Sequence, residues 1–159
     1  MKKDSIYKRM ADVREDLDLT QKKLAEKMKV KSNVYSKWER EIELMPLTRL
    51  NQFCNVTEVS MDYVTGLTLK KEKTNNIEVL DKKEIGKKLR QIRKSKNMSQ
   101  QDMADFLKTS QSVISAYENG KVLILSAFIY QIAVKYQISL DWICGRREEQ
   151  TLKKSMSLT

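Results

Sequence analysis

The hydrophobic pattern is clearest in residues 98–121, where apolar positions recur at helical spacing on both sides of a short polar break. Met103 and Leu107 are four residues apart, as are Val113 and Tyr117, so each pair lies on one face of a helix. Two short helices that are joined by a tight turn form a helix-turn-helix unit. The pattern therefore predicts such a unit in this stretch.

The polar residues at the two helix starts support this interpretation. Ser99 and Ser110 are suited to cap the N-termini of the two helices, because a serine hydroxyl accepts a hydrogen bond from a free backbone N–H of the first turn. A glutamine follows each cap, at Gln100 and Gln111.

The same pattern occurs a second time, 79 residues earlier in the chain. The register holds without a gap over about 60 residues, and polar and small residues keep it as well as apolar ones. Corresponding residues include Arg14 and Arg93, Gln21 and Gln100, Ala25 and Ala104, Glu39 and Glu118, Asp62 and Asp141, and Gly66 and Gly145. We therefore interpret the chain as two copies of one five-helix domain.

The predicted fold is all-α, with two tandem five-helix domains that each bury a small core of their own. The first copy spans residues 1–67 and the second 82–146; a polar linker, 68–81, joins them, and residues 147–159 form a frayed tail or a short extra helix. The expected helices are 4–17, 21–29, 32–40, 46–56 and 60–65, then 82–96, 100–108, 111–118, 124–136 and 139–144.

Several short motifs make the second copy resemble the helix-turn-helix of the lambda-repressor/Cro-like (XRE-type) DNA-binding family. They are Ser99-Gln100, the small Ala104, the serine-containing helix 111–118, the run Glu118-Asn119-Gly120-Lys121 and the closing segment 138–143, ISLDWI. The resemblance implies two lambda-repressor-like domains that bind DNA. It also implies that the arginine of helix 1 pairs with the glutamate that ends helix 3, which gives Arg14–Glu39 and Arg93–Glu118.

One feature departs from the family pattern. The turn between helices 2 and 3 usually holds a glycine, and this chain has Lys29 and Lys108 there. A lysine with positive φ costs roughly 1 kcal/mol, so the turn is either slightly strained or different in geometry.

The charge of the chain also favours a nucleic-acid partner. The net charge is +10 and the isoelectric point is near 9.5, which suits a polyanion. Residues 1–67 hold 13 Lys and Arg against 11 Asp and Glu, whereas residues 85–147 hold 11 against 4. We therefore expect the second copy to dominate DNA affinity, and the first to be a weaker reader or a partner-binding module.

Helix 3 of each copy, the reading helix, has the size to enter the major groove, where base edges are read. Glutamine and asparagine suit adenine, lysine suits guanine, and serine is permissive. The candidate base-reading residues are Gln111, Ser112, Ser115 and Ala116 in the second copy, and Ser32, Asn33, Ser36 and Lys37 in the first. Because the two sets differ, the two copies would read different base sequences.

Other residues are candidates for phosphate contact, which sets position and affinity rather than sequence. In the family, the glutamine after the helix-2 cap touches phosphate and braces the first residue of helix 3. The candidates are Gln100, Asn119 and Lys121 in the second copy, and Gln21, Lys22 and Arg40 in the first. Glu41 and Glu43 would lie near phosphate and weaken binding by the first copy.

An apolar stretch before and within helix 4 of the second copy departs from the usual polar pattern. Leu123, Leu125 and Phe128 form a candidate interface, because Leu125 and Phe128 are three apart and adjoin on one helix face. The alternatives are a two-fold dimer contact, docking onto the first copy, or a slightly larger local core.

The leading hypothesis is a sequence-specific, double-stranded-DNA-binding transcriptional repressor that acts as a homodimer, with a protein inducer or antirepressor as a further candidate partner. The alternative is a protein-interaction module of the antirepressor or antitoxin kind. We expect no enzymatic activity, metal, cofactor or small-molecule ligand, because the chain has no histidine, no glycine-rich phosphate loop and no metal-spaced cysteines.

The sequence also gives expectations about where in the cell the protein is located. No apolar run reaches about 18 residues and the N-terminus lacks an apolar signal region, so neither a membrane span nor a signal peptide is expected. Cys54 and Cys144 are expected to be buried thiols rather than a disulfide. These features suggest a cytoplasmic protein, and the family resemblance implies that it is associated with a bacterial nucleoid or encoded by a phage or mobile element.

Overall fold

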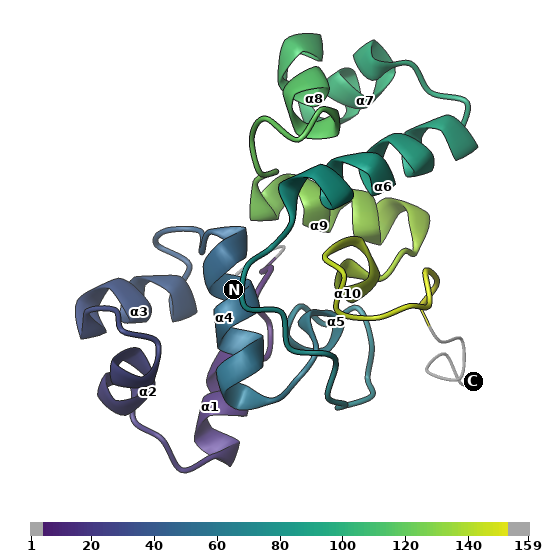
Figure 1. The fold of residues 1–159 in the computed structure, drawn as a ribbon. Helices are drawn as coiled ribbons and strands as arrows, with labels where there is room; N and C mark the ends of the chain where they lie inside the picture. The colour runs from purple at the N-terminus through teal and green to yellow at the C-terminus, as the bar shows by residue number, and fades with distance from the viewer. Residues whose placement is uncertain (1–4, 153–159) are drawn as a thin grey trace.

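The structure is a computed structural model that describes residues 5–152, and these residues form ten helices and no strand (Figure 1). The all-α fold with two copies of one domain is therefore confirmed. The first copy contains α1 (Met10–Asp16), α2 (Gln21–Lys27), α3 (Ser32–Glu39), α4 (Leu47–Thr57) and α5 (Met61–Val64). The second contains α6 (Lys82–Ser95), α7 (Gln100–Leu107), α8 (Gln111–Glu118), α9 (Ser126–Tyr136) and α10 (Leu140–Ile143).

Hydroxyl side chains define where the helices of both copies begin. Thr20 and Ser99 cap α2 and α7, and Ser60 and Ser139 cap α5 and α10, each accepting from the backbone N–H three residues further on. Asp102 returns the bond to the Ser99 N–H and completes a capping box. The equivalent caps explain why the two copies follow the same helix register.

The first helix is shorter than the predicted range 4–17, because α1 begins only at Met10. The preceding segment is committed to contacts elsewhere. The Tyr7 N–H donates to the Glu41 carboxylate at 3.0 Å, and the Tyr7 hydroxyl lies 3.0 Å from that of Ser126 in the second copy. Residues 5–9 therefore follow a bend and a turn outside the helix and bridge the copies.

The lysines in the helix-2 to helix-3 turns adopt the left-handed conformation. Lys29 has φ +57° and Lys108 has φ +58°. The turns therefore keep the geometry that a glycine would adopt freely, at a cost of roughly 1 kcal/mol each.

The segment expected to be a polar linker, 68–81, is packed against the first copy. Leu80 is buried, and the Ile77 carbonyl accepts hydrogen bonds from the amides of Asn51 and Asn55 at 2.6 and 2.7 Å. The segment joins the copies as predicted, but it is not only a polar connection, because the buried Leu80 and the Ile77 backbone anchor it, and a backbone contact gives no signal in the sequence.

The expected tail, 147–159, is also ordered where the structure describes it. Ile138 and Thr151 form an isolated antiparallel bridge, and the Ser139 N–H donates to the Gln150 carbonyl at 2.8 Å. Residues 147–152 are thus neither frayed nor helical. The rest of the expected tail, 153–159, lies outside the described residues.

The two copies share one hydrophobic core. Buried apolar residues from Ile6 to Cys144 belong to a single continuous cluster, which replaces the two separate small cores that we expected. Both cysteines are free and buried, and burial raises the pKa of each thiol. Within residues 5–152, no helix combines the length and apolar character needed to cross a membrane.

Helices α6 and α8 approach closely at Gly86. A Cβ atom at this position would lie 2.7 Å from the Glu118 carbonyl oxygen and closer still to that of Tyr117. Both obstacles are backbone atoms at the end of the reading helix, which cannot move aside without shifting α8. Glycine is therefore required here by space rather than by dihedral angle.

We predict that Gly86→Ala lowers the unfolding free energy by about 1–3 kcal/mol, because the added methyl group forces α6 and α8 apart. Urea unfolding followed by circular dichroism measures the change. Gln91→Ala, at an exposed position of the same helix, is the control and should alter stability by no more than about 0.5 kcal/mol. Equal effects of the two substitutions would contradict the close approach.

Candidate nucleic-acid interface

A buried arginine–glutamate pair fixes the end of the reading helix in each copy. The Arg93 guanidinium binds the Glu118 carboxylate with two bonds, Nε to Oε2 at 2.7 Å and Nη2 to Oε1 at 2.9 Å. The Arg14 guanidinium binds the Glu39 carboxylate in the same way, at 2.7 and 3.2 Å. Both implied pairs are formed in the structure, and each joins the first helix of a copy to the third.

The ionised state of these glutamates is set by competing effects. Burial alone would raise the pKa of Glu118, but hydrogen bonds from Arg93, Gln100 and Arg90 hold that pKa below its ordinary value. Burial is likewise outweighed at Glu39, where hydrogen bonds from Arg14 and Gln21 leave the pKa lowered. The carboxylates are therefore ionised at neutral pH despite their burial.

The glutamine after each helix-2 cap extends this network toward the reading helix. Gln100 and Gln21 donate from Nε2 to Glu118 and Glu39, each at 3.1 Å. In the second copy the network continues one step further, because Gln111 donates to the Gln100 Oε1 at 2.6 Å. A candidate base-reading side chain is thus linked through hydrogen bonds to the buried ion pair.

The eight candidate base-reading residues lie on accessible faces of α8 and α3. Gln111, Ser112, Ser32 and Asn33 are exposed, at the first two positions of each reading helix, and the other four are half-buried. Nothing from the other copy contacts these first-turn side chains in the described hydrogen-bond and ion-pair network. The arrangement presents the helix N-termini, with their polar side chains, to the outside.

Lys37 and Asn119 are further candidate DNA-contacting residues whose side chains are engaged within the protein. Lys37 pairs with Glu43 at 3.3 Å, which partly neutralises the reading face of α3. Asn119 accepts from Arg90 at 3.0 Å and donates to Ser115 at 3.2 Å, at the end of α8. These bonds would have to open or rearrange before either residue bound DNA.

The remaining phosphate candidates are placed around the reading helices. Lys22, Arg40 and Lys121 are exposed, whereas Gln21 and Gln100 are half-buried by the contacts described above. Among residues 5–152, no three His, Cys, Asp or Glu side chains are grouped so that they could bind a metal ion.

The Glu41 carboxylate, which we expected to lie near phosphate, is bound within the first copy. It accepts from the Ser5 hydroxyl and from the Tyr7 N–H, and the Glu41 backbone is left-handed at φ +53°. The residue where the second copy has Gly120 therefore serves as an anchor for the N-terminal segment. Sequence comparison of the copies could not show this, because Ser5 and Tyr7 correspond to residues of other types, Glu84 and Gly86.

The candidate interface residues Leu123, Leu125 and Phe128 do not form one surface in the structure. Phe128 packs edge-on to Tyr117 with ring centroids 6.4 Å apart, and Leu123 packs against the same core, whereas Leu125 is exposed. The neighbouring Ser126 makes the contact with the first copy, since its hydroxyl donates to the Met45 carbonyl at 2.7 Å. A joint outward face of Leu125 and Phe128 was therefore the wrong interpretation.

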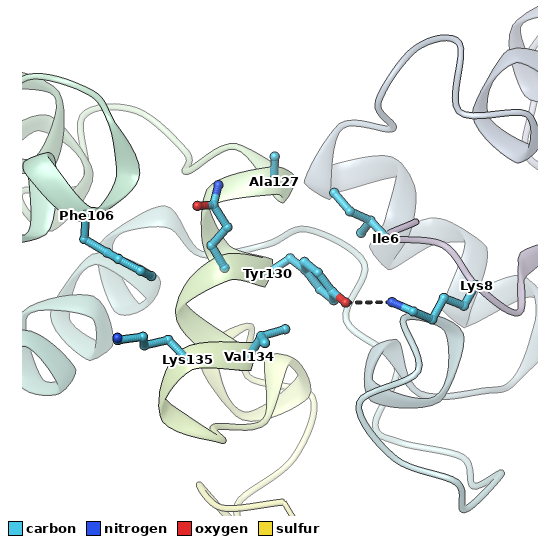
Figure 2. A pocket seen from close by; sticks show the side chains of 8 residues that line it. Ile6, Lys8, Phe106, Ala127, Tyr130, Val134 and Lys135 are labelled. Atoms are coloured by element: carbon cyan, nitrogen blue, oxygen red, sulfur yellow. Dashed lines mark hydrogen bonds between the residues drawn. The ribbon is translucent and has the colours of Figure 1, made fainter. Parts of the chain in front are cut away.

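Sequence reasoning missed the contacts that join the copies. Lys8 donates to the Tyr130 hydroxyl at 2.8 Å across a groove of about 640 Å³, lined also by Ile6, Phe106 and Val134 (Figure 2). Asp62 and Asp141, which we recognised only as matching positions of the repeat, are buried between α5 and α10. The sequence feature that could have identified Asp62 and Asp141 is an aspartate in the first turn of a short helix whose other residues are mostly apolar.

Fold and site together define a tandem helix-turn-helix protein with two outward-facing reading helices. A family model described as helix-turn-helix matches the chain twice, at residues 10–64 and 89–143. The chain therefore belongs to the lambda-repressor-like (XRE-type) helix-turn-helix family of DNA-binding regulators. No curated protein matches the chain at a significant level.

We predict that Arg93→Met lowers the unfolding free energy by about 3–5 kcal/mol, because it removes the main partner of a buried carboxylate. Arg90→Met is the matched control. Arg90 touches the same carboxylate at 3.3 Å, but its side chain is 42% exposed against 10% for Arg93. An exposed pair contributes about 0–1 kcal/mol. Chemical denaturation of both variants tests this, and similar losses would contradict it.

Acid should destabilise the protein through the same glutamates. Since the folded-state pKa values of Glu39 and Glu118 are lowered, their stabilisation is fully present above the unfolded value of about 4.3 and is lost as pH falls through the folded values. Urea unfolding measured from about pH 6 to pH 3 should show this fall. Glu118→Gln, which cannot titrate there, should show a shallower pH slope; an unchanged slope would refute the assignment.

Proposed function

We propose that the protein is a sequence-specific, double-stranded-DNA-binding transcriptional repressor. It reads the major groove with α8 of the second copy and, more weakly, with α3 of the first. Base discrimination falls to Gln111, Ser112, Ser115 and Ala116 in α8. The corresponding set in α3 is Ser32, Asn33, Ser36 and Lys37.

The observation that carries this proposal is the exposed first turn of α8, held by a buried anchor. Gln111 is exposed, yet its amide is oriented by Gln100, which is itself bound to Glu118. An oriented amide offers a donor and an acceptor at once, which is the pattern that adenine presents in the major groove. Pre-orientation reduces the conformational entropy lost when such a side chain binds.

Charge supports a larger share of affinity for the second copy. Residues 85–147 carry 11 Lys and Arg against 4 Asp and Glu, and residues 1–67 carry 13 against 11. Lys37 of α3 is in addition paired with Glu43. Since phosphate contacts supply most non-specific affinity, the second copy should bind first and the first copy should add selectivity.

The alternative class is a protein-interaction module that uses the helix-turn-helix surfaces to hold a protein partner, such as an antirepressor or antitoxin. It is distinguished by whether the first turns of α3 and α8 are covered by protein or by DNA in the functional complex. We also propose a protein inducer and the absence of enzymatic activity; a homodimer would be required only if a single chain did not supply both reading helices.

The test is selection of bound duplexes from a random DNA pool with the full chain, at one fixed salt concentration. The full chain is needed because the copies share a core. We expect an enriched motif, and Gln111→Ala should relax part of it by about 1–3 kcal/mol of discrimination per base. Gln131→Ala, an exposed glutamine on α9, should leave the motif unchanged. If no sequence is enriched, the regulator proposal fails and the protein-interaction class becomes the one to pursue.

A further inference from the structure

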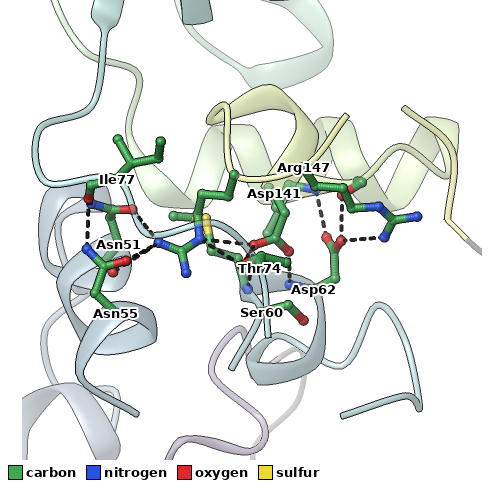
Figure 3. Close-up of polar contacts among 12 residues, drawn as sticks. Asn51, Asn55, Ser60, Asp62, Thr74, Ile77, Asp141 and Arg147 are labelled. Atoms are coloured by element: carbon green, nitrogen blue, oxygen red, sulfur yellow. Dashed lines mark hydrogen bonds and ion pairs between the residues drawn. The ribbon is translucent and has the colours of Figure 1, made fainter. Parts of the chain in front are cut away.

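The two copies meet through a reciprocal exchange of helix caps. The Asp62 carboxylate, in α5, accepts from the Leu140 N–H at 2.7 Å and from the Ser139 hydroxyl at 2.5 Å, both at the start of α10. The Asp141 carboxylate, in α10, accepts from the N–H groups of Met61 and Asp62 at 3.0 and 2.9 Å, at the start of α5 (Figure 3). Each short helix is thus capped by the other copy.

This exchange has the signature of a two-fold axis. Asp62 and Asp141 are equivalent residues of the repeat, and so are Met61 and Leu140, since each pair is 79 residues apart. Residue 62 contacts 140 while residue 141 contacts 61, so the contact is the same when viewed from either side. Such self-complementary contacts arise from two-fold rotation, whereas a head-to-tail repeat would join two different surfaces.

The fourth helices also contact the opposite copy at equivalent positions, but the donors are not equivalent residues, since Arg146 corresponds to Leu67 and Lys8 to Lys87. Asn51 of α4 and Tyr130 of α9 are also equivalent positions. Arg146 donates to the Asn51 side chain at 2.7 Å, and Lys8 donates to the Tyr130 hydroxyl at 2.8 Å. In each case a basic residue of one copy reaches the same position on the fourth helix of the other.

The contact is also buried. Asp62 and Asp141 are 1% and 0% exposed, and the Arg146 side chain that binds Asp141 is 1% exposed. Together with the continuous apolar core, these bonds leave the copies little freedom to move apart. In Figure 1 the α2–α3 unit lies at the lower left and the α7–α8 unit at the top, on either side of the α5–α10 contact.

We infer that one chain is a complete two-reader unit and that its DNA partner is an inverted repeat with two unlike halves, bound by a single chain. This inference rests on the proposed function and specifies the substrate of that site. The two-fold relation between copies sets the inverted orientation. The different reading faces, which begin Gln111-Ser112 in α8 and Ser32-Asn33 in α3, set the unlike halves. A second chain is not needed to supply the second reading helix.

The first arm of the test uses the wild-type chain and the duplex obtained by selection. Native mass spectrometry should find one chain per duplex, and the motif should consist of two unlike halves in opposite orientation. Two chains per duplex, identical halves or directly repeated halves would each overturn the inference while leaving the DNA-binding proposal intact. A failure to enrich any sequence would instead remove the proposed function itself.

The second arm tests the rigid spacing without altering the protein. Linking two binding modules raises affinity by about 10²–10⁴-fold over one module alone, provided that both can engage. Insertion of about half a helical turn, 5 base pairs, between the halves turns one of them to the far side of the duplex. We expect affinity to fall to that of a single half-site. An unchanged affinity would mean that the copies are flexibly joined, and would overturn the inference.

Two single substitutions show which reading helix contacts which half of the DNA motif. Gln111→Ala should relax base preference in one half only, and Asn33→Ala should relax it in the other half only. Both residues are exposed at the first turn of their helices, so neither substitution disturbs the core. If both variants relaxed the same half, or if Asn33→Ala had no effect on either half, one of the reading helices would not contact the site and the inference would fail.

Discussion

The structure depends on one constraint, which is that a carboxylate taken out of water must find charged or backbone donors. Four carboxylates meet this constraint, and their positions determine how each reading helix and each copy is held. Glu39 and Glu118 bind the arginines of the first helices and thereby fix the angle of each reading helix. Asp62 and Asp141 bind backbone N–H groups across the α5–α10 contact and thereby fix one copy against the other. Losing a donor at Glu39 or Glu118, whose pKa values are lowered, leaves buried charge without compensation.

The internal repeat and the helix order could be predicted from the sequence because they rest on local signals, namely apolar periodicity and hydroxyl caps. The contacts between the copies could not be predicted from the sequence. Their acceptors are carboxylates such as Asp62, but their donors are backbone N–H groups that any residue type provides. The residue pattern does not show which backbone N–H group will bind a given carboxylate. The anchoring of the segment around Ile77 escaped prediction for a similar reason, since its carbonyl rather than its side chain receives the bonds from Asn51 and Asn55.

The two copies have diverged most where they no longer need to be alike. The second copy keeps Gly120 at the end of its reading helix, whereas the first has Glu41, which holds the Ser5–Tyr7 segment. That segment reaches Ser126 on the opposite copy. A position that follows the reading helix in one copy has thus become part of the internal junction in the other. Divergence of this kind is possible when the two copies are fused in one chain, because each copy always occupies the same one of the two positions in the pair.

The reciprocal caps between α5 and α10 also bear on how the protein responds to its own abundance. A regulator assembled from separate chains must first associate, so at low concentration the assembled form rises with the square of the amount of protein. Here the association is built into the chain by residues 68–81 and is held by Asp62 and Asp141. Occupancy of a site would then follow protein concentration in direct proportion, without a threshold. Such a response favours steady control at a few molecules per cell over switching.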